Sequence, residues 1–315
     1  MSDELSEGLV VRIDRKQVHV EVGAETWLCA LRGRLFETVD SSTRPVAVGD
    51  RVMVRRDGET GAVEAVLPRR NAVVRPVPRS PEKIQTIAAN VDVIAVIASL
   101  RNPVVRETLI DRLLVVTESF GLDSILVLNK TDLCGREEIE PLQEIYQSLR
   151  YRVFPVSATF ETGLIELGAA LEDRIVMLLG PSGAGKSSIL NALEPGLGLK
   201  VGEVNRKDHK GRHTTTFASL LSLQRLRARV VDTPGIREFG LSQIRPEDLG
   251  ALFRDLKPFH ASCRYPDCVH QPEPDCAVQQ AVEKGAIRRA RYESYLKLLA
   301  ELHGEGERMA RHSSF

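Results

Sequence analysis

The first quarter of the chain alternates between apolar and polar residues in short runs. Five runs lie between residues 8 and 67, separated by glycine, aspartate or other polar turn residues: GLVVRI, QVHVEV, ETWLCAL, GDRVMVRR and GAVEAVL. Alternation with a period of two predicts β-strands, and five short strands in succession predict a small closed or half-closed barrel. A segment rich in proline and arginine follows from Pro68 to Glu82, and this composition predicts a domain linker.

The pattern then changes to continuous apolar runs that alternate with helical periodicity. The run from Val91 to Ser99 is typical of a strand buried on both faces, and four more strands are expected at SILVLN, YRVFPVSA, DRIVMLLG and VVDTPG. Helices are expected over residues 106–120 and 139–150. Alternation of this kind predicts a mostly parallel sheet with helices on both sides.

After residue 240 the strand pattern stops, and helices are expected over residues 277–284 and 286–303. A chain of 315 residues is long enough for two or three domains. We therefore expect a multidomain α/β protein with a barrel over residues 1–72, an α/β domain over residues 73–240 and a helical domain over residues 241–315.

Composition limits the function classes. Forty-three basic side chains balance 43 acidic ones, so nucleic acid would be bound through local basic patches and not through overall attraction. The N-terminal residues lack the pattern of a secretory signal, and no apolar run is long enough to cross a membrane. We expect a cytoplasmic protein that is a monomer and contacts neither membrane nor DNA.

A phosphate-binding loop is the strongest motif. GPSGAGKSS fits G-x-x-x-x-G-K-S, follows a predicted strand and precedes a helical pattern, which is the context that gives this motif its meaning. Lys186 is expected to contact the β- and γ-phosphates of a nucleotide, and Ser187 to coordinate Mg²⁺. The loop residues expected to bind nucleotide are Gly180, Pro181, Ser182, Gly183, Ala184, Gly185, Lys186, Ser187 and Ser188.

A second strand ends in Asp-Thr-Pro-Gly about 50 residues later. Asp232 is expected to hold the Mg²⁺ shell, and the Gly235 N–H to sense the γ-phosphate. In the polar segment between the two motifs, RKDHKGRHTTTF, a threonine is expected to complete the magnesium shell, with Thr215 favoured and Thr214 as the alternative. Ile236 stands where many GTPases carry a water-orienting glutamine, so intrinsic turnover should be slow and His213 is the candidate catalytic replacement.

Asn129, Lys130, Thr131 and Asp132 form an N-K-x-D sequence that predicts guanine recognition. A carboxylate at the base edge accepts hydrogen bonds from guanine N1–H and the 2-amino group, whereas adenine lacks this donor pair. Ser157 and Ala158 are expected to support the base from its O6 side.

The base-reading motif precedes the phosphate loop, which reverses the usual order of a GTPase. Joining the termini of a compact domain and cutting it elsewhere changes chain order without changing the fold. The sequence therefore predicts a circularly permuted G domain. Because the segment after the Asp-Thr-Pro-Gly motif leads directly into the C-terminal domain, hydrolysis is expected to reposition that domain.

Three cysteines and a histidine lie within 14 residues near the C-terminus, at Cys263, Cys268, His270 and Cys276. Four such ligands predict a closed tetrahedral Zn²⁺ site with a structural role, because no coordination position remains for a catalytic water. Cys29 and Cys134 are interpreted as ordinary thiols.

Two further features have open interpretations. Trp27, the only tryptophan, is interpreted as a half-buried barrel residue, with base stacking as the alternative. The arginines within Arg288–Arg291 either contact phosphates or form a solvated helix face.

Taken together, the motifs VLNKTDL, GPSGAGKSS, GRHTTT, DTPGIREFGL and CRYPDCVHQPEPDCAV, followed by RYESYLKLL, resemble the RsgA (YjeQ) family of circularly permuted GTPases. The resemblance is carried mainly by residues 90–299. It implies an N-terminal OB-fold domain, GTP and GDP as ligands, and a zinc domain. It also implies that the protein acts late in assembly of the small ribosomal subunit and that this subunit stimulates its GTPase activity. The barrel and the zinc domain are implied to bind ribosomal RNA.

Two other classes of function are weighed against this one. A non-catalytic RNA-binding scaffold with a relic nucleotide pocket would show no stimulation of GTP turnover by small subunits. An ATP-using P-loop kinase would prefer ATP over GTP, and Asn129 and Asp132 argue against it.

Overall fold

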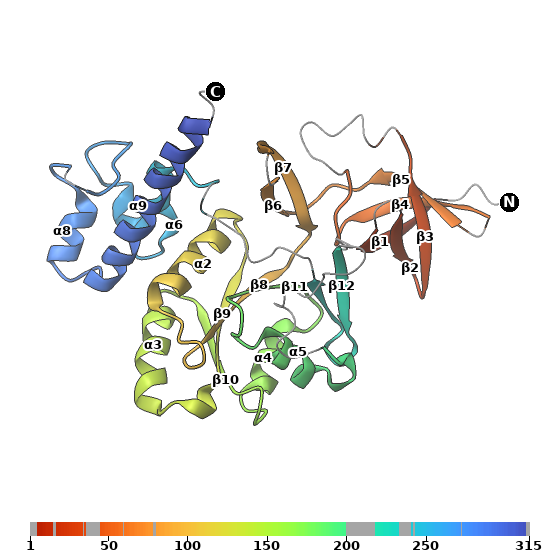
Figure 1. The fold of residues 1–315 in the computed structure, drawn as a ribbon, viewed down its shortest axis with the longest axis horizontal. Helices are drawn as coiled ribbons and strands as arrows, with labels where there is room; N and C mark the ends of the chain where they lie inside the picture. The colour runs from red at the N-terminus through yellow and green to blue at the C-terminus, as the bar shows by residue number, and fades with distance from the viewer. Residues whose placement is uncertain are drawn as a thin grey trace.

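The computed structural model describes residues 5–14, 17–33, 35, 45–58, 60–77, 80–199, 218–232, 241, 243–271 and 273–312. Figure 1 shows three parts in a row: an N-terminal barrel, a central α/β domain and a C-terminal group of helices. Within the described ranges, no helix combines the length and the apolar character needed to cross a bilayer.

The five alternating runs form the predicted barrel. Its strands are β1 (Leu5–Ile13), β2 (Val18–Val22), β3 (Glu25–Leu31), β4 (Arg51–Asp57) and β5 (Thr60–Val66). Hydrogen bonding follows the order β1-β2-β3-β5-β4 and closes where β4 pairs with β1. Inward side chains such as Val10, Val20 and Val54 are fully buried. This closed antiparallel arrangement, with β3 and β5 parallel, is that of an OB fold.

The central domain contains the predicted, mostly parallel sheet. Its spatial order is β10-β9-β8-β11-β13-β12, and all neighbours are parallel except β12 and β13. The strands are β8 (Val93–Ser99), β9 (Ser124–Asn129), β10 (Arg152–Val156), β11 (Ile175–Leu179), β12 (Ala218–Leu223) and β13 (Ala228–Asp232). The helices are α2 (Glu107–Ser119), α3 (Arg136–Ser148), α4 (Leu164–Leu171) and α5 (Lys186–Leu193), with 3₁₀ turns at Thr131–Leu133, Pro195–Leu197 and Gln224–Leu226.

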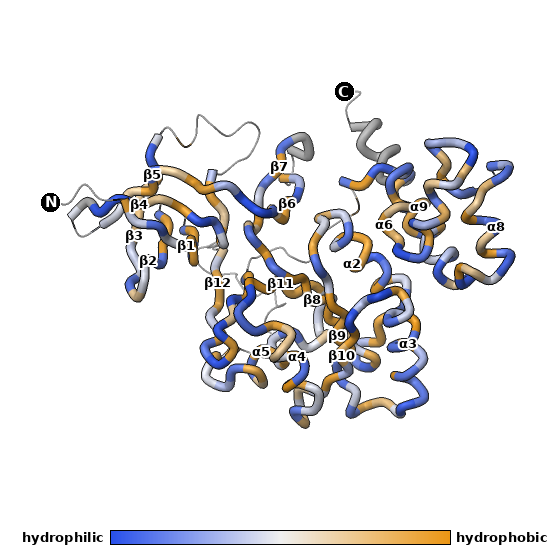
Figure 2. Tube along the Cα trace, turned by 180° about the vertical axis from the view of Figure 1, so that it is seen from behind, coloured by the Kyte–Doolittle hydropathy of each residue, from blue (hydrophilic) through white to orange (hydrophobic). Residues whose placement is uncertain are grey.

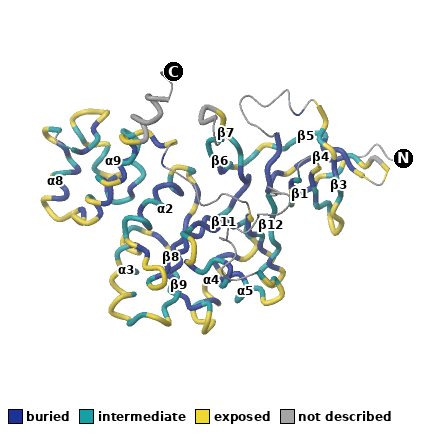
Figure 3. The backbone as a smooth tube through the Cα atoms, viewed as in Figure 1, coloured by how far each residue is buried: buried dark blue, intermediate teal, exposed yellow. Residues whose placement is uncertain are grey.

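Both faces of this sheet are covered, which explains the continuous apolar runs. On β8, Ile94 and Val96 pack on the side of α2 and α3, whereas Val93, Ala95 and Ile97 pack on the side of α4 and α5. The central strands are accordingly hydrophobic in Figure 2 and buried in Figure 3. Among the described strands and α-helices of this domain, α4 and β12 were not predicted from the sequence.

Strand β12 also joins the barrel to the α/β domain. It pairs with β1 through Arg12 opposite Ser219 and Ile13 opposite Ala218, so that the two sheets become continuous. Arg229 on β13 forms an ion pair with Glu21 on β2 at 2.5 Å, which reinforces this contact.

The prediction of a linker over residues 68–82 is wrong for most of that segment. Strands β6 (Ala72–Val77) and β7 (Ser80–Ala89) pair as an antiparallel hairpin. Just before it, the Arg69 guanidinium donates two hydrogen bonds, of 2.7 and 2.8 Å, to the fully buried carboxylate of Asp50 in the barrel. Asn90 donates to the Gly49 carbonyl oxygen at 2.8 Å and accepts from the Arg70 N–H. These bonds make the connection a fixed joint.

The C-terminal part is helical, as expected, and no strand follows β13 in the described part of the chain. It contains α6 (Leu249–Leu252), α7 (Lys257–His260), α8 (Ala277–Glu283) and α9 (Arg289–His312), with a 3₁₀ turn at Pro246–Asp248. Helix α9 packs against α2 of the central domain and ends nine residues beyond its predicted limit.

A buried ionic cluster holds α9 on the central domain. The guanidinium of Arg291 pairs with the Asp111 carboxylate on α2 and, at 3.0 Å, with Asp255 before α7. The Tyr146 hydroxyl donates to Asp111 at 2.7 Å. Burial raises the pKa of Asp111, although the Arg291 guanidinium opposes the rise. Arg291 is only 3% exposed, so it does not belong to a solvated helix face, whereas Arg288 is exposed.

We expect Arg291→Met to lower the free energy of unfolding by about 3 kcal/mol, because it leaves two carboxylates buried without their counter-charge. The matched change Arg288→Ala should stay within about 0.5 kcal/mol of the wild type. Removing the guanidinium raises the Asp111 pKa further, so the stability of Arg291→Met should fall more steeply with rising pH. Urea unfolding at two pH values checks both statements, and equal losses in the two variants would contradict them.

Candidate nucleotide-binding site and metal centre

The parallel strands bring the predicted motifs to one edge of the sheet. Asn129, at the end of β9, lies opposite Ser99 of β8 and Val156 of β10. On β11, Met177 lies opposite Val231 of β13. Since the phosphate loop follows β11 and Asp232 ends β13, the base-reading motif, the Ser157-Ala158 pair, the phosphate loop and Asp232 all lie at the carboxyl edge.

Asn129 connects the base-reading motif to the phosphate loop. Its side-chain amide donates to the Ala184 carbonyl oxygen at 2.9 Å, and its oxygen accepts from the Ala158 N–H at 3.4 Å. The Asn129 side chain is 1% exposed. At Gly185, whose φ is +96°, a Cβ would lie 2.0 Å from the Asn129 amide nitrogen, so only glycine fits this close approach.

Asp132 is held in place by a neighbouring motif. The Ser157 hydroxyl donates to Asp132 Oδ1 at 2.6 Å and accepts from the Phe160 N–H at 3.2 Å. Lys130 adopts a left-handed backbone, with φ of +65°, and its ammonium donates to the Asn102 carbonyl oxygen. Thr131 and Asp132 begin a short 3₁₀ turn. The hydroxyl of Ser157 thus orients the carboxylate expected to read guanine.

The phosphate loop wraps around the amino end of α5. The Lys186 ammonium donates to the Gly180 and Pro181 carbonyl oxygens at 2.7 and 2.9 Å, so it lies across the neck of the loop. Ser187 is 7% exposed in the first helical turn. Ser182 and Gly183 form the exposed tip of the loop. Backbone N–H groups and the helix dipole make such a turn suited to anions.

Asp232 is the described residue of the Asp-Thr-Pro-Gly motif. The surrounding protein removes water from its carboxylate and raises its pKa, although part of the side chain reaches the surface. A desolvated carboxylate that gains from a nearby positive charge suits a magnesium-binding role. His213, Thr214, Thr215 and Gly235 lie outside the described residues, so their predicted roles remain predictions.

The four predicted zinc ligands converge in the C-terminal part. The sulfurs of Cys263, Cys268 and Cys276 lie 3.5, 3.4 and 3.4 Å from His270 Nδ1. The sulfur of Cys276 lies 3.9 Å from that of Cys263 and 3.8 Å from that of Cys268. Tetrahedral zinc, with bonds of about 2.3 Å to sulfur and about 2.0 Å to nitrogen, separates two sulfurs by about 3.8 Å and sulfur from nitrogen by about 3.5 Å. The donor set is therefore consistent with zinc.

A second histidine orients the metal-site imidazole. His260 Nδ1 lies 2.8 Å from His270 Nε2, so the hydrogen bond directs Nδ1 of His270 toward the sulfurs. Burial lowers the pKa of His270 to about 4, so its ring is neutral near pH 7. A Cβ at Gly250 would lie 2.5 Å from His270 Nε2. The histidine pair therefore fits only because residue 250 is glycine.

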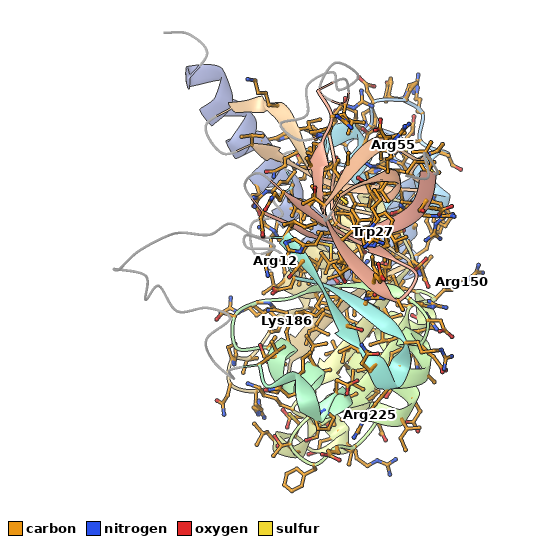
Figure 4. The ribbon with its side chains drawn as sticks, turned by 90° about the vertical axis from the view of Figure 1, so that its right-hand side faces the viewer. Arg12, Trp27, Arg55, Arg150, Lys186 and Arg225 are labelled. Carbon is orange, nitrogen blue, oxygen red and sulfur yellow. The ribbon has the colours of Figure 1, made fainter. Side chains whose placement is uncertain are left out.

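Some contributing residues carry no motif. His260 was not predicted from the sequence because it lies outside the metal-ligand spacing, and Asn102 was not predicted because it contributes a backbone carbonyl. The Asn-Pro dipeptide at 102–103 did offer a turn signal. Trp27 is partly buried, as expected for a barrel residue, with the Arg56 guanidinium 5.1 Å from its ring centroid. Figure 4 shows Trp27 on the barrel and Lys186 on the central domain.

The central sheet is that of a G domain, and along the chain the base-reading strand comes before the phosphate loop. This order defines a circularly permuted GTPase. A family model described as RsgA GTPase matches residues 66–242. The chain belongs to the RsgA GTPase family.

Curated relatives of this family match almost the whole chain. The small ribosomal subunit biogenesis GTPase RsgA of Moorella thermoacetica is 39% identical over 94% of this chain and 97% of its own. The corresponding protein of Thermotoga neapolitana is 38% identical over 95% of this chain and 98% of its own.

Solved structures agree with the fold. YjeQ from Thermotoga maritima has a TM-score of 0.78 and 34% identity, covering 96% of this chain and 99% of that one. YloQ, described as a circularly permuted GTPase, has a TM-score of 0.74 and 27% identity, covering 96% of both chains.

We expect the purified protein to contain one zinc ion per chain and Cys268→Ser to lose most of it, because three ligands hold the ion much less tightly than four. The melting temperature should fall with the zinc content. Cys134→Ser, at a cysteine far along the chain from the cluster, is the matched control and should keep its zinc. Elemental analysis with thermal unfolding provides the measurement, and full zinc content in Cys268→Ser would refute the assignment.

Proposed function

We propose that this GTPase binds GTP across the carboxyl edge of the central sheet and acts in biogenesis of the small ribosomal subunit. The observation that carries the nucleotide assignment is the hydrogen bond from Asn129 to Ala184, which joins the base-reading motif to the phosphate loop. Both ends of one nucleotide can then be held by segments that are widely separated along the chain.

Base recognition rests on Asp132. Its carboxylate accepts hydrogen bonds from guanine N1–H and the 2-amino group, while Ser157 keeps the carboxylate in place through Oδ1. Ser157 and Ala158 support the base from its O6 side. Thr131 belongs to the same turn and fixes the spacing between Lys130 and Asp132.

The phosphates lie along the loop from Gly180 to Ser188, with Lys186 moving from the loop carbonyls to the β- and γ-phosphates. Ser187 and Asp232 hold magnesium, and Thr215, or Thr214, completes the shell. When bound, the ion neutralises charge that develops on the phosphate oxygens. The Gly235 N–H contacts the γ-phosphate.

Hydrolysis is slow in the isolated protein because Ile236 cannot orient the attacking water. His213 takes that role when a partner is bound. This division of labour makes turnover depend on the partner.

The partner is the small ribosomal subunit and its RNA, as the names of the curated relatives suggest. The barrel and the zinc domain contact ribosomal RNA. The half-buried Trp27 with the nearby Arg56, and the exposed Arg288, supply the aromatic and basic groups that such contacts use.

Nucleotide state is coupled to the zinc domain. The chain leaves β13 at Asp232 and continues directly into this domain, whose helix α9 is joined to α2 by Arg291. A shift of the segment after Asp232 is therefore transmitted to the zinc domain, which is also held on the central domain through α2.

We expect Asp132→Asn to weaken GTP binding by at least about a hundredfold, because an amide places a donor against the guanine donors. The same variant should gain affinity for xanthosine triphosphate, whose 2-oxygen is an acceptor. Asp123→Asn, at the opposite end of β9, should change neither affinity. Competition titrations with GTP, ATP and xanthosine triphosphate measure these changes, and unaltered base preference would disprove the role of Asp132.

Purified small ribosomal subunits should accelerate GTP hydrolysis by at least about tenfold, because the proposed catalytic role of His213 depends on the bound partner. Phosphate release, titrated with subunits, is the measurement. Lys186→Ala should be inactive with and without subunits, which shows that the signal comes from this site. Wild-type turnover that does not respond to subunits would favour a non-catalytic scaffold.

A further inference from the structure

The loop between β8 and α2 contacts both halves of the nucleotide site. The Lys130 ammonium donates to the Asn102 carbonyl oxygen in this loop. A Cβ added at Gly183, at the tip of the phosphate loop, would lie 3.1 Å from Pro103 Cδ. One short segment therefore touches the base-reading motif and the phosphate loop, and neither motif includes it.

This loop is firmly anchored beside the site. The Ser99 hydroxyl, at the end of β8, donates to the Pro103 carbonyl oxygen at 2.6 Å, and the Val105 N–H donates to the Ser99 carbonyl oxygen at 3.0 Å. The Leu100 N–H bonds to the Asn129 carbonyl oxygen at 3.4 Å. The loop shape is thus fixed from the same strand ends that carry the motifs.

The backbone of Asn102 decides where its carbonyl points. Its φ of +46° lies in the left-handed region, which asparagine and glycine adopt readily and β-branched residues adopt at a cost. In this conformation the carbonyl accepts from the Lys130 ammonium, so the lysine side chain is tied at its end to the β8–α2 loop, two residues before Asp132.

We infer that Asn102 is a positioning residue for guanine nucleotides: its left-handed backbone fixes the Lys130 side chain as one wall of the base site. This inference rests on the proposed GTP site and adds the β8–α2 loop to it. Asn102 acts through its carbonyl oxygen and not through its side chain, so glycine can replace it.

The test compares two substitutions at one position. Asn102→Val disfavours the left-handed backbone and should weaken GDP binding about tenfold, because the competent loop becomes a minor conformation. Asn102→Gly keeps that backbone accessible and should restore binding to near the wild-type value. Val104→Ala, in the same loop at a side chain 63% exposed, is the neutral control. Titration with fluorescently labelled GDP gives the affinities.

A double-variant cycle identifies the route of the effect. Lys130→Met keeps an apolar stem and removes the ammonium, so Asn102→Val should add little to the loss seen in Lys130→Met. Losses that multiply, or equal weakening by valine and glycine at 102, would overturn the inference while leaving GTP binding intact. A wild-type protein that binds no GDP would instead overturn the proposed function, and this inference with it.

Melting temperatures without nucleotide separate positioning from folding. If Asn102 acts by positioning Lys130, Asn102→Val should bind GDP more weakly than the wild type while its melting temperature stays nearly unchanged. If valine destabilises the protein, Asn102→Ala imposes a smaller backbone cost and should show the same order of affinities, between glycine and valine. Full affinity in both the alanine and the valine variant would refute the role of the loop.

Discussion

The site depends on one buried hydrogen bond, from the side chain of Asn129 to the carbonyl oxygen of Ala184. The two residues are 55 positions apart and belong to segments whose order is reversed relative to an ordinary GTPase. An unpaired amide in this position would cost on the order of 1–3 kcal/mol, so the bond constrains both loops. The glycine at 185 follows from it, since any side chain there would occupy the place of the amide.

Much of the fold could be predicted because its core strands are covered on both faces. The run SILVLN matches β9 from Ser124 to Asn129, since a strand buried on both sides leaves an unbroken apolar run. Strand β12 escaped prediction because its exposure does not alternate with a period of two. The hairpin β6–β7 was read as a linker because Pro76 and the neighbouring arginines suggest a loop. A two-stranded ribbon tolerates proline, since each strand has an open edge.

The residues of the candidate site also fall into two groups: those that a sequence motif identifies and those that only a tertiary contact identifies. Asp132, Lys186 and the Cys₃His cluster could be predicted as site residues because each belongs to a contiguous motif whose spacing reflects its chemistry. His260 and Asn102 could not, because their partners come from other segments and, for Asn102, the acting group is a backbone carbonyl present in every residue. The fixed joint of Arg69 with Asp50 likewise depends on a tertiary contact, and an arginine-rich sequence alone does not reveal it.

The shared sheet has a consequence for dissecting this protein. Strand β12 receives its outer neighbour from the barrel, at Ala218 and Ser219, and Arg229 receives its counter-ion from Glu21. Removing the N-terminal strands would leave main-chain donors and acceptors of β12 unpaired and able to bond to a strand of another molecule. The Arg229 guanidinium beside them would lose its counter-ion. The GTPase core is therefore a poor candidate for isolation by itself, because the barrel covers the edge of its sheet at β12.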